Sequence, residues 1–394
     1  MLQVKLFHPP LYLSLLFFSL SLAAYSVLVH HFALLWNKQD LQTYYIAAQD
    51  VLANRNIYLS GHTYFNFLYT PFTALLFTPF ALLPIAVFKW SIAILSIFSL
   101  LLSCWLTLTF LGYKQRKMLL SATLFLSGFL LWLEPVQQTL EYGQINLILM
   151  TLILIGFRLR EKPYLSGLSI GLAAAIKLTP AIFIAYLFLT RQTRAGMIAL
   201  TTVVVTILIG FFILPASSQH YWHGLFLDTS RIGDAKLIGD QSLNALLSRM
   251  FGNEISAKPY WYILGVIFGI GGLYLAKRAY AKRHELLGIL FCAFTGLLIS
   301  PFSWSHHWVW IVPLLIYCFQ LTYAKQYYYG WLALLALFTL FGWLTPLIPN
   351  LSSMHHIITF TTPKLRLFYL QENAYVFFGI FFLIISGVCI FRRK

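Results

Sequence analysis

Apolar runs long enough to cross a membrane recur from Leu11 to Ile390, and they restrict the possible folds of this chain more than any other feature. Each run holds roughly 16 to 27 residues, and about 20 residues of helix cross the ~30 Å of hydrocarbon in a bilayer. With 60% hydrophobic and 10% charged residues, the chain has too little polar surface for a soluble fold. The sequence therefore predicts an all-α polytopic membrane protein.

The basic residues indicate how this protein is oriented. The formal charge of +16 is not gathered in one domain or stripe, as nucleic-acid binding would require, but lies in short clusters between the apolar runs. Such clusters are typical of cytoplasmic loops. We therefore expect both termini inside, no nucleic-acid partner, and the longer polar loops outside. The clusters lie at 114–117, 158–162, 191–194, 277–283 and 392–394, and the external loops at 37–70, 215–258 and 345–373.

Eleven spans are predicted, and one of them must be divided. The run 164–190 lies between two basic clusters, so both of its ends are expected inside, and Lys177 and Pro180 interrupt its middle. A hairpin with Lys177 at its outer tip satisfies both observations and gives about twelve crossings in a single membrane-embedded domain, 1–394. The spans are 11–36, 86–112, 118–133, 144–157, 164–190, 195–214, 259–276, 285–300, 308–323, 328–344 and 374–391.

The first external loop contains an amphipathic segment, Asp40 to Ala53. Its apolar residues, including Tyr44 and Tyr45, recur at i, i+3, i+4 and i+7, which predicts a helix on the outer membrane surface. Asp40 begins this helix, so it either caps free backbone amides or serves as a general base that takes a proton from a hydroxyl.

Three other external segments carry polar side chains. In 134–146, Gly143 precedes Gln144 and Asn146, whose amides either bind sugar hydroxyls or finish a helix end. In 239–249, Leu243, Leu246 and Leu247 form a stripe with the following Met250 that is expected to face the membrane, with Gln241, Asn244 and Arg249 off the stripe. Arg249 either pairs with a phosphate or reaches the interface.

The third segment, 300–310, contains Trp304, His306 and His307. These residues suit an interfacial aromatic belt with histidines in water, and the histidines could also donate hydrogen bonds to a phosphate oxygen. The remaining ligands of a zinc site are missing, and there is no HExxH, Walker A, GxGxxG or GxSxG motif. Direct nucleotide binding is therefore not expected.

Taken in order, these segments resemble glycosyltransferase family 87, whose members use polyprenyl-phosphate-mannose and have the multi-spanning type C (GT-C) fold. The resemblance covers 40–313, about two-thirds of the chain. After the first external helix such families show a glycine and then a proline before a tyrosine, whereas this chain has Asn54 to Tyr58. The matching residues are Asp40, Tyr44, Tyr45, Ala47 and Ala48; Tyr69 to Pro71 and Pro79; Gly143 to Asn146; Gly171 and Ile176 to Pro180; Asp240 to Leu243; and Ser300, Pro301, Trp304, His306 and His307.

The resemblance implies transfer of a mannosyl or other hexosyl residue from a polyprenyl-phosphate donor to a lipid or glycan hydroxyl outside a bacterial cytoplasmic membrane. Asp40 would deprotonate the acceptor, and attack opposite the phosphate would invert the anomeric carbon. No metal or other cofactor is expected. The departing phosphate would be bound by Lys177, Arg249, His306 and His307, and the substrates by Tyr44, Tyr45, Gln144, Asn146, Gln241, Asn244 and Trp304.

A transporter or flippase of lipid-linked glycans is the main alternative function. It predicts charges at the bilayer midplane and inverted internal repeats, whereas here the midplane is nearly free of charge and no repeat is found. A purely structural membrane subunit would leave the ordered polar motifs unexplained. The acceptor and the identity of the sugar are not fixed by the sequence.

Overall fold

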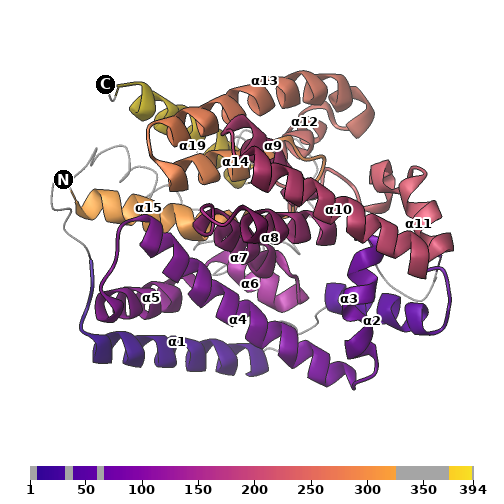
Figure 1. The fold of residues 1–394 in the computed structure, drawn as a ribbon, viewed down its shortest axis with the longest axis horizontal. Helices are drawn as coiled ribbons and strands as arrows, with labels where there is room; N and C mark the ends of the chain where they lie inside the picture. The colour runs from indigo at the N-terminus through magenta and orange to yellow at the C-terminus, as the bar shows by residue number, and fades with distance from the viewer. Residues whose placement is uncertain (1–6, 32–38, 60–65, 325–371, 393–394) are drawn as a thin grey trace, which may run out of the picture. The chain divides into compact units, whose positions relative to one another are not determined.

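A computed structural model describes residues 7–31, 39–59, 66–324 and 372–392 (Figure 1). Throughout this described part the regular elements are helices, apart from one isolated β-bridge between Asp240 and Trp304. The chain divides into two compact units. Unit 1 comprises 1–19, 107–137 and 235–394, and unit 2 comprises 20–106 and 138–234.

Unit 2 contains the first external loop and the hairpin predicted at 164–190. Its helices are α2 (Gln39–Leu52), α3 (Pro71–Ala81), most of α4 (Ile85–Phe110), α7 (Asn146–Arg158), α8 (Pro163–Ile176), η2 (Thr179–Ala181), α9 (Ile182–Leu189), α10 (Thr193–Ile213), α11 (Pro215–Trp222), η3 (Leu225–Leu227) and η4 (Thr229–Arg231). The helices α1 (Leu11–His31) and α6 (Glu134–Tyr142) begin in unit 1 and end in unit 2.

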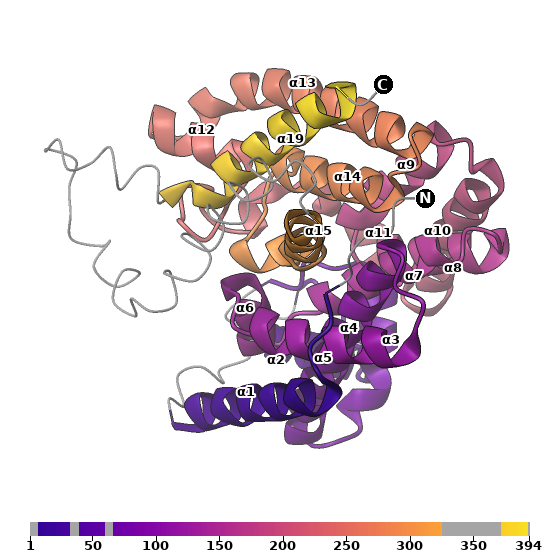
Figure 2. The same cartoon turned by 90° about the vertical axis from the view of Figure 1, so that its left-hand side faces the viewer.

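Unit 1 is built around α14, whose residues are apolar on all sides and almost all buried, as expected for a core helix. Figures 1 and 2 show α13, α14 and α19 side by side. Phe294 on α14 packs against Phe378 and Phe382 on α19 and against Trp308. The helices of unit 1 are α5 (Arg116–Leu130), α12 (Leu243–Phe251), α13 (Glu254–Ala281), α14 (Glu285–Ile299), η5 (Ser305–Trp310), α15 (Ile311–Tyr323) and α19 (Ala374–Arg392).

The prediction of a helical membrane protein is confirmed. Among the described residues, α4, α10, α13 and α19 are long and apolar enough to cross a membrane, and α5 and α6 would form a fifth span bent by 77°. Each predicted span that lies in the described part coincides with one or two helices. The predicted span 328–344 lies outside the described residues, and the count of twelve crossings and the GT-C fold stay predictions.

The predicted hairpin at 164–190 is confirmed by the packing of α8. Gly167 lies against Ala195 and Gly171 against Ala199, so α8 and α10 run in the same direction with the same offset. The chain must therefore reverse between them, and α9 provides the return. Lys177 stands in the break directly after α8, at the predicted tip.

One expectation about packing is wrong. Leu243, Leu246 and Leu247 on α12 do not face the membrane but are buried within the protein, and only Met250 of this stripe is exposed. The uncharged polar residues of α12, Asn244 and Ser248, are buried as well. An amphipathic period shows that one face of a helix is covered. It does not show whether protein or lipid covers that face, because both are apolar.

The end of α2 explains how this chain manages without the glycine of the resembling families. The backbone N–H of Arg55 donates to the carbonyl of Asp50, and that of Asn54 to the carbonyl of Val51, which is a Schellman motif. Asn54 takes the left-handed position with φ +52°. Asparagine tolerates this conformation better than other residues with a Cβ. Asn54 therefore supplies the left-handed residue that ends α2 in this chain.

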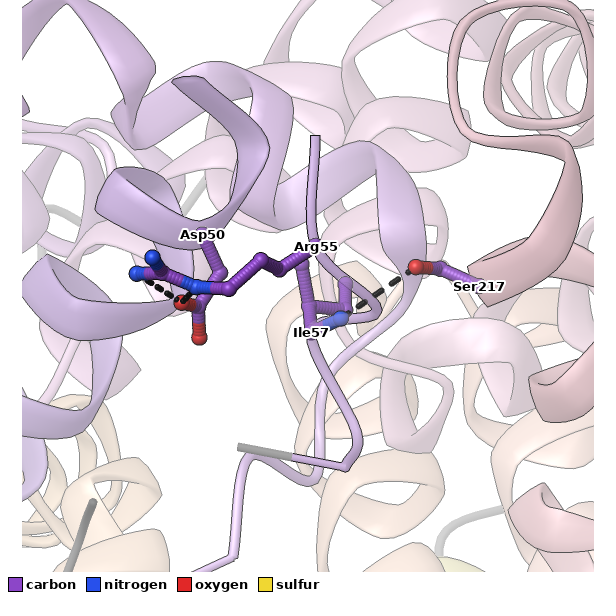
Figure 3. A network of polar contacts seen from close by, with 4 residues as sticks. All are labelled: Asp50, Arg55, Ile57 and Ser217. Carbon is purple, nitrogen blue, oxygen red and sulfur yellow. Dashed lines mark hydrogen bonds and ion pairs between the residues drawn. The ribbon is translucent and has the colours of Figure 1, made fainter. Parts of the chain in front are cut away.

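Side chains fix the chain that follows this turn (Figure 3). The guanidinium of Arg55 donates to Asp50 Oδ1, 2.7 Å from Nε and 2.6 Å from Nη2. The side chain of Asp50 is completely buried, and Arg55 is its ion-pair partner. Two residues later, the N–H of Ile57 donates to Ser217 Oγ on α11.

We predict that Asn54→Ala lowers the free energy of unfolding by about 1 kcal/mol, because a residue with a Cβ pays about 1–2 kcal/mol in the left-handed region and alanine lacks the local hydrogen bonding of asparagine. Asn54→Gly should be at least as stable as the wild type. Thermal unfolding in detergent checks the order, with Gln49→Ala on the exposed part of α2 as control. Equal midpoints for the alanine and glycine variants at 54 would contradict it.

Candidate functional site

The candidate site in unit 2 begins where two antiparallel helices end together. Gly156 on α7 packs against Ser166 on α8, and the hydroxyl of Ser169 donates to the carbonyl of Leu152, so the two helices run in opposite directions. The start of α7 therefore meets the end of α8. There the Lys177 ammonium donates to Asn146 Oδ1 at 3.2 Å.

The start of α3 is fastened to the same place. The last carbonyls of a helix have no partner within the helix and need outside donors. Thr70 donates through its hydroxyl to the carbonyl of Ala175 at 2.6 Å, and Thr73 donates to that of Ile176 at 2.7 Å. Pro71 supplies the first turn of α3, where its missing N–H costs nothing. These bonds bring Tyr69 to the end of α8, with the Lys177 ammonium 5.4 Å from its ring centroid.

The first turn of α2 adds the carboxylate. Asp40 Oδ2 accepts a hydrogen bond of 2.7 Å from the side-chain amide of Gln144. Asp40 is half-buried, whereas Tyr44, one turn later, is 1% exposed and stacks on Phe77 of α3. The structure thus brings together five residues predicted for the site: Asp40, Tyr44, Gln144, Asn146 and Lys177.

Gly143 lets Gln144 approach α2. It has φ +69° and ends α6 in a Schellman motif, in which the N–H of Gln144 donates to the carbonyl of Thr139. A Cβ at Gly143 would lie 2.7 Å from the Cβ of Leu41, the residue after Asp40. Glycine is needed here both for the turn and for the close contact.

Burial sets the protonation of the acid and the base in this site. Burial raises the pKa of the Asp40 carboxyl above its ordinary range, and the hydrogen bond from Gln144 and the charge of Lys177 partly oppose this. Burial lowers the pKa of the Lys177 ammonium to about 7, against the attraction of Asp40. Burial therefore moves the pKa of each group toward neutral pH, and a group whose pKa lies near the working pH transfers protons most effectively.

Tyr69 belongs to this site, although it is absent from the predicted site residues. Its hydroxyl donates to Gln144 Oε1 at 2.8 Å and accepts from the hydroxyl of Tyr44 at 2.7 Å. The available signal was its place in the motif Tyr69 to Pro71, to which the sequence analysis gave no role in the site. Tyr45, predicted to bind substrate, donates its hydroxyl to the carbonyl of Leu83.

The remaining predicted residues gather in unit 1, around a buried carboxyl group. Asp240 Oδ1 accepts from the backbone N–H of Ser242 at 3.1 Å and of Ser303 at 2.8 Å. Asp240 is completely buried, which raises its pKa to about 7. This carboxyl joins the start of α12 to the turn before η5, where Trp304 is half-buried. In η5, which follows, His306 is buried and His307 is half-buried.

Several predicted residues of unit 1 make structural contacts. The guanidinium of Arg249 donates to Asn373 Oδ1 at 2.6 and 3.0 Å and to the carbonyl of Asp240 at 3.0 and 3.1 Å. The amide of Gln241 donates to two backbone carbonyls and accepts from the N–H of Tyr375. These bonds connect α12 with the start of α19.

Asn244, also on α12, donates to the carbonyl of Pro301 at 3.2 Å. In the described part of the chain, no three His, Cys, Asp or Glu side chains are close enough to hold a metal ion. Binding of substrate by the residues of unit 1 stays a prediction, as does the independence from metal.

A half-buried carboxylate and a lysine in one cluster, in a chain whose longer helices could cross a membrane, define a membrane protein with the side chains of an acid–base enzyme. The sequence pattern of glycosyltransferase family 87 matches residues 67–301. The chain belongs to this family and is a glycosyltransferase, as the resemblance implied.

Its relatives are transferases as well. A polyprenol-phosphate-mannose-dependent alpha-(1-2)-phosphatidylinositol mannoside mannosyltransferase of Mycobacterium tuberculosis is 33% identical over 291 residues, covering 70% of this chain and 68% of the relative. The enzyme of the same name from Mycolicibacterium smegmatis is 30% identical over 313 residues, 73% and 71% of the two chains. An alpha-(1->3)-arabinofuranosyltransferase of Corynebacterium glutamicum is 24% identical over 311 residues, 75% and 70%. These likenesses favour the enzyme over the transporter.

We predict that Gly143→Ala destabilises the protein by about 2 kcal/mol and lowers transferase activity, because a Cβ is strained in the left-handed region and collides with Leu41. Thermal unfolding in detergent measures the first effect. Gly265→Ala on α13 is the matched control, since its Cβ would enter open space and alanine favours helix. Equal effects of the two substitutions would show that the contact with α2 is not needed.

Proposed function

We propose that this glycosyltransferase moves a mannosyl residue from a polyprenyl-phosphate donor to a hydroxyl group of a lipid or glycan acceptor. The names of its relatives in Mycobacterium and Mycolicibacterium support the donor, and they favour a glycosylated phosphatidylinositol as the acceptor. The observation that carries the proposal is the cluster of Asp40, Gln144 and Lys177 at the joined ends of α7 and α8.

In the proposed reaction, Asp40 takes the proton of the acceptor hydroxyl. The hydroxyl oxygen then forms a bond to the anomeric carbon from the side opposite the phosphate, and the bond from that carbon to the phosphate oxygen breaks. This inverts the anomeric carbon, so that a β-linked donor gives an α-linked product. The raised pKa of Asp40 supports the role of general base, because a base works best when its pKa lies near the working pH.

Lys177 is proposed to bind the donor phosphate, whose negative charge grows as its bond to the sugar breaks. A cation fixed beside that position stabilises the transition state more than the bound donor. We further propose that the site faces the outside of a bacterial cytoplasmic membrane, with both termini inside. The basic clusters between the spans support this orientation.

The first test is transfer of radiolabelled mannose from a polyprenyl-phosphate-mannose donor to membrane extracts, with purified wild type and Asp40→Asn. The asparagine keeps the shape but cannot take a proton, so kcat should fall about 100-fold or more. Asp234→Asn, an exposed carboxylate outside the cluster, is the control. Equal rates for wild type and Asp40→Asn would keep the enzyme and remove Asp40 as base.

If neither protein transfers mannose under conditions where the donor binds, the proposed reaction is wrong. Movement of the intact donor across proteoliposomes would then favour the transporter. The same assay with extracts that contain or lack phosphatidylinositol mannosides tests the acceptor. A product formed in both extracts indicates a different acceptor.

We predict that kcat/KM for the donor falls as the pH rises through about 7, because Lys177 then loses the proton that binds the phosphate. Arginine stays charged throughout this range. Lys177→Arg should therefore remove this alkaline decline, whereas Lys177→Met should weaken donor binding at all pH values. Steady-state kinetics between pH 6 and 9 check this, and an unchanged decline in the arginine variant would exclude Lys177 as its source.

A further inference from the structure

The inference concerns how Asp40 is held, and it rests on the proposed function. The side chain of Gln144 makes its hydrogen bonds within one small cluster. Nε2 donates to Asp40 Oδ2, and Oε1 accepts from Tyr69 at 2.8 Å and from Tyr44 at 3.0 Å. Gln144, Tyr44 and Tyr69 are 6%, 1% and 7% exposed, so water does not replace these bonds.

Both phenols donate toward Gln144 Oε1, Tyr69 directly and Tyr44 either through Tyr69 or directly. Each phenol has one proton to donate. When Tyr69 gives its proton to Gln144, Tyr44 gives its own to Tyr69, 2.7 Å away. The reverse orientation of the amide would turn its N–H₂ group toward the two hydroxyls and its oxygen toward the carboxylate, where two acceptors repel each other. The donors therefore all point toward Asp40.

The tyrosines keep this direction over a wide pH range. Burial raises the pKa of Tyr44 well above its ordinary value, and the nearby charge of Asp40 raises it further. The pKa of Tyr69 is also raised by burial and by Asp40, although the hydrogen bond from Tyr44 lowers it. Both phenols therefore stay protonated at and above neutral pH.

We propose that Gln144 is the positioning residue of the general base, oriented by a relay of donors from Tyr44 through Tyr69. The amide holds Oδ2 of Asp40, and among the described residues no hydrogen bond is made to Oδ1. The relay therefore presents Oδ1 to the acceptor hydroxyl, and this is the oxygen that takes the proton when the new glycosidic bond forms. In this proposal Tyr44 and Gln144 orient Asp40 and do not bind the sugar directly.

The test compares Gln144→Ala with Gln144→Glu in mannose transfer as a function of pH. The amide stabilises the charged form of Asp40, so its loss raises the pKa of that carboxyl and moves the acidic limb of kcat to higher pH. In Gln144→Glu a second carboxyl faces the first, and the limb should move further. A loss of about 100-fold in kcat is expected for both, with the donor KM changed little.

A merely structural role predicts the opposite order, because glutamate keeps the length of Gln144 and the acceptor for Tyr69, whereas alanine leaves a cavity. If Gln144→Glu is the milder variant and the acidic limb stays where it is in the wild type, the proposal is overturned. Transfer by the wild type and its loss in Asp40→Asn establish the reaction separately, so failure of the relay and failure of the proposed function are distinguishable.

The tyrosines provide a second test. Tyr44→Phe leaves Tyr69 to orient the amide, and Tyr69→Phe leaves Tyr44 at 3.0 Å, so each should lower kcat by less than about 10-fold. The double variant removes both donors and should fall to the level of Gln144→Ala. Tyr113→Phe, which removes a hydrogen-bonded phenol in unit 1, controls for the loss of such a group. Strictly additive effects of Tyr44→Phe and Tyr69→Phe would contradict the relay.

Discussion

The carbonyl groups at the end of α8 are the constraint on which the site depends. A helix that ends inside a protein must find outside donors for its last carbonyls, and the missing bonds would cost several kcal/mol in an apolar surrounding. Thr70 and Thr73 provide them from the first turn of α3. This requirement connects two segments about one hundred residues apart, and it is what sets Tyr69 beside Lys177.

Close packing of small residues gives the rest of the alignment. Gly156, Gly167 and Gly171 remove side chains where α8 touches α7 and α10, and without a hydrophobic force between helices in lipid such contacts determine how they pack. A hypothetical Cβ at Gly167 or Gly171 would meet backbone oxygen atoms at 2.5 and 2.7 Å. Close backbone contacts, rather than long side chains, thus fix the position of α8 along its neighbours and with it the position of Lys177 relative to Asn146.

The helices and their order were predictable from the sequence. The apolar runs indicate the length of each helix, and the basic clusters between them indicate on which side of the membrane each helix is expected to begin and end. The hairpin at 164–190 followed from the charge of its ends and from Lys177 in its middle. The burial of α12 did not follow, since the period of Leu243 to Leu247 is the same against lipid and against protein. Asp40 and Gln144 were identified as candidates, but the bond between them depends on Gly143 and Leu41 in three dimensions, which no spacing reveals. Tyr69 was missed for the same reason: its partners lie on three other segments.

The side-chain amide between Asp40 and the two phenols also separates them chemically. A primary amide donates through nitrogen and accepts through oxygen, but at neutral pH it neither gains nor loses a proton. It therefore transmits orientation and insulates against proton transfer. In the proposed reaction, the proton that Asp40 takes from the acceptor therefore cannot pass through Gln144 to the buried tyrosines, and Asp40 must release it by another route before the next turnover.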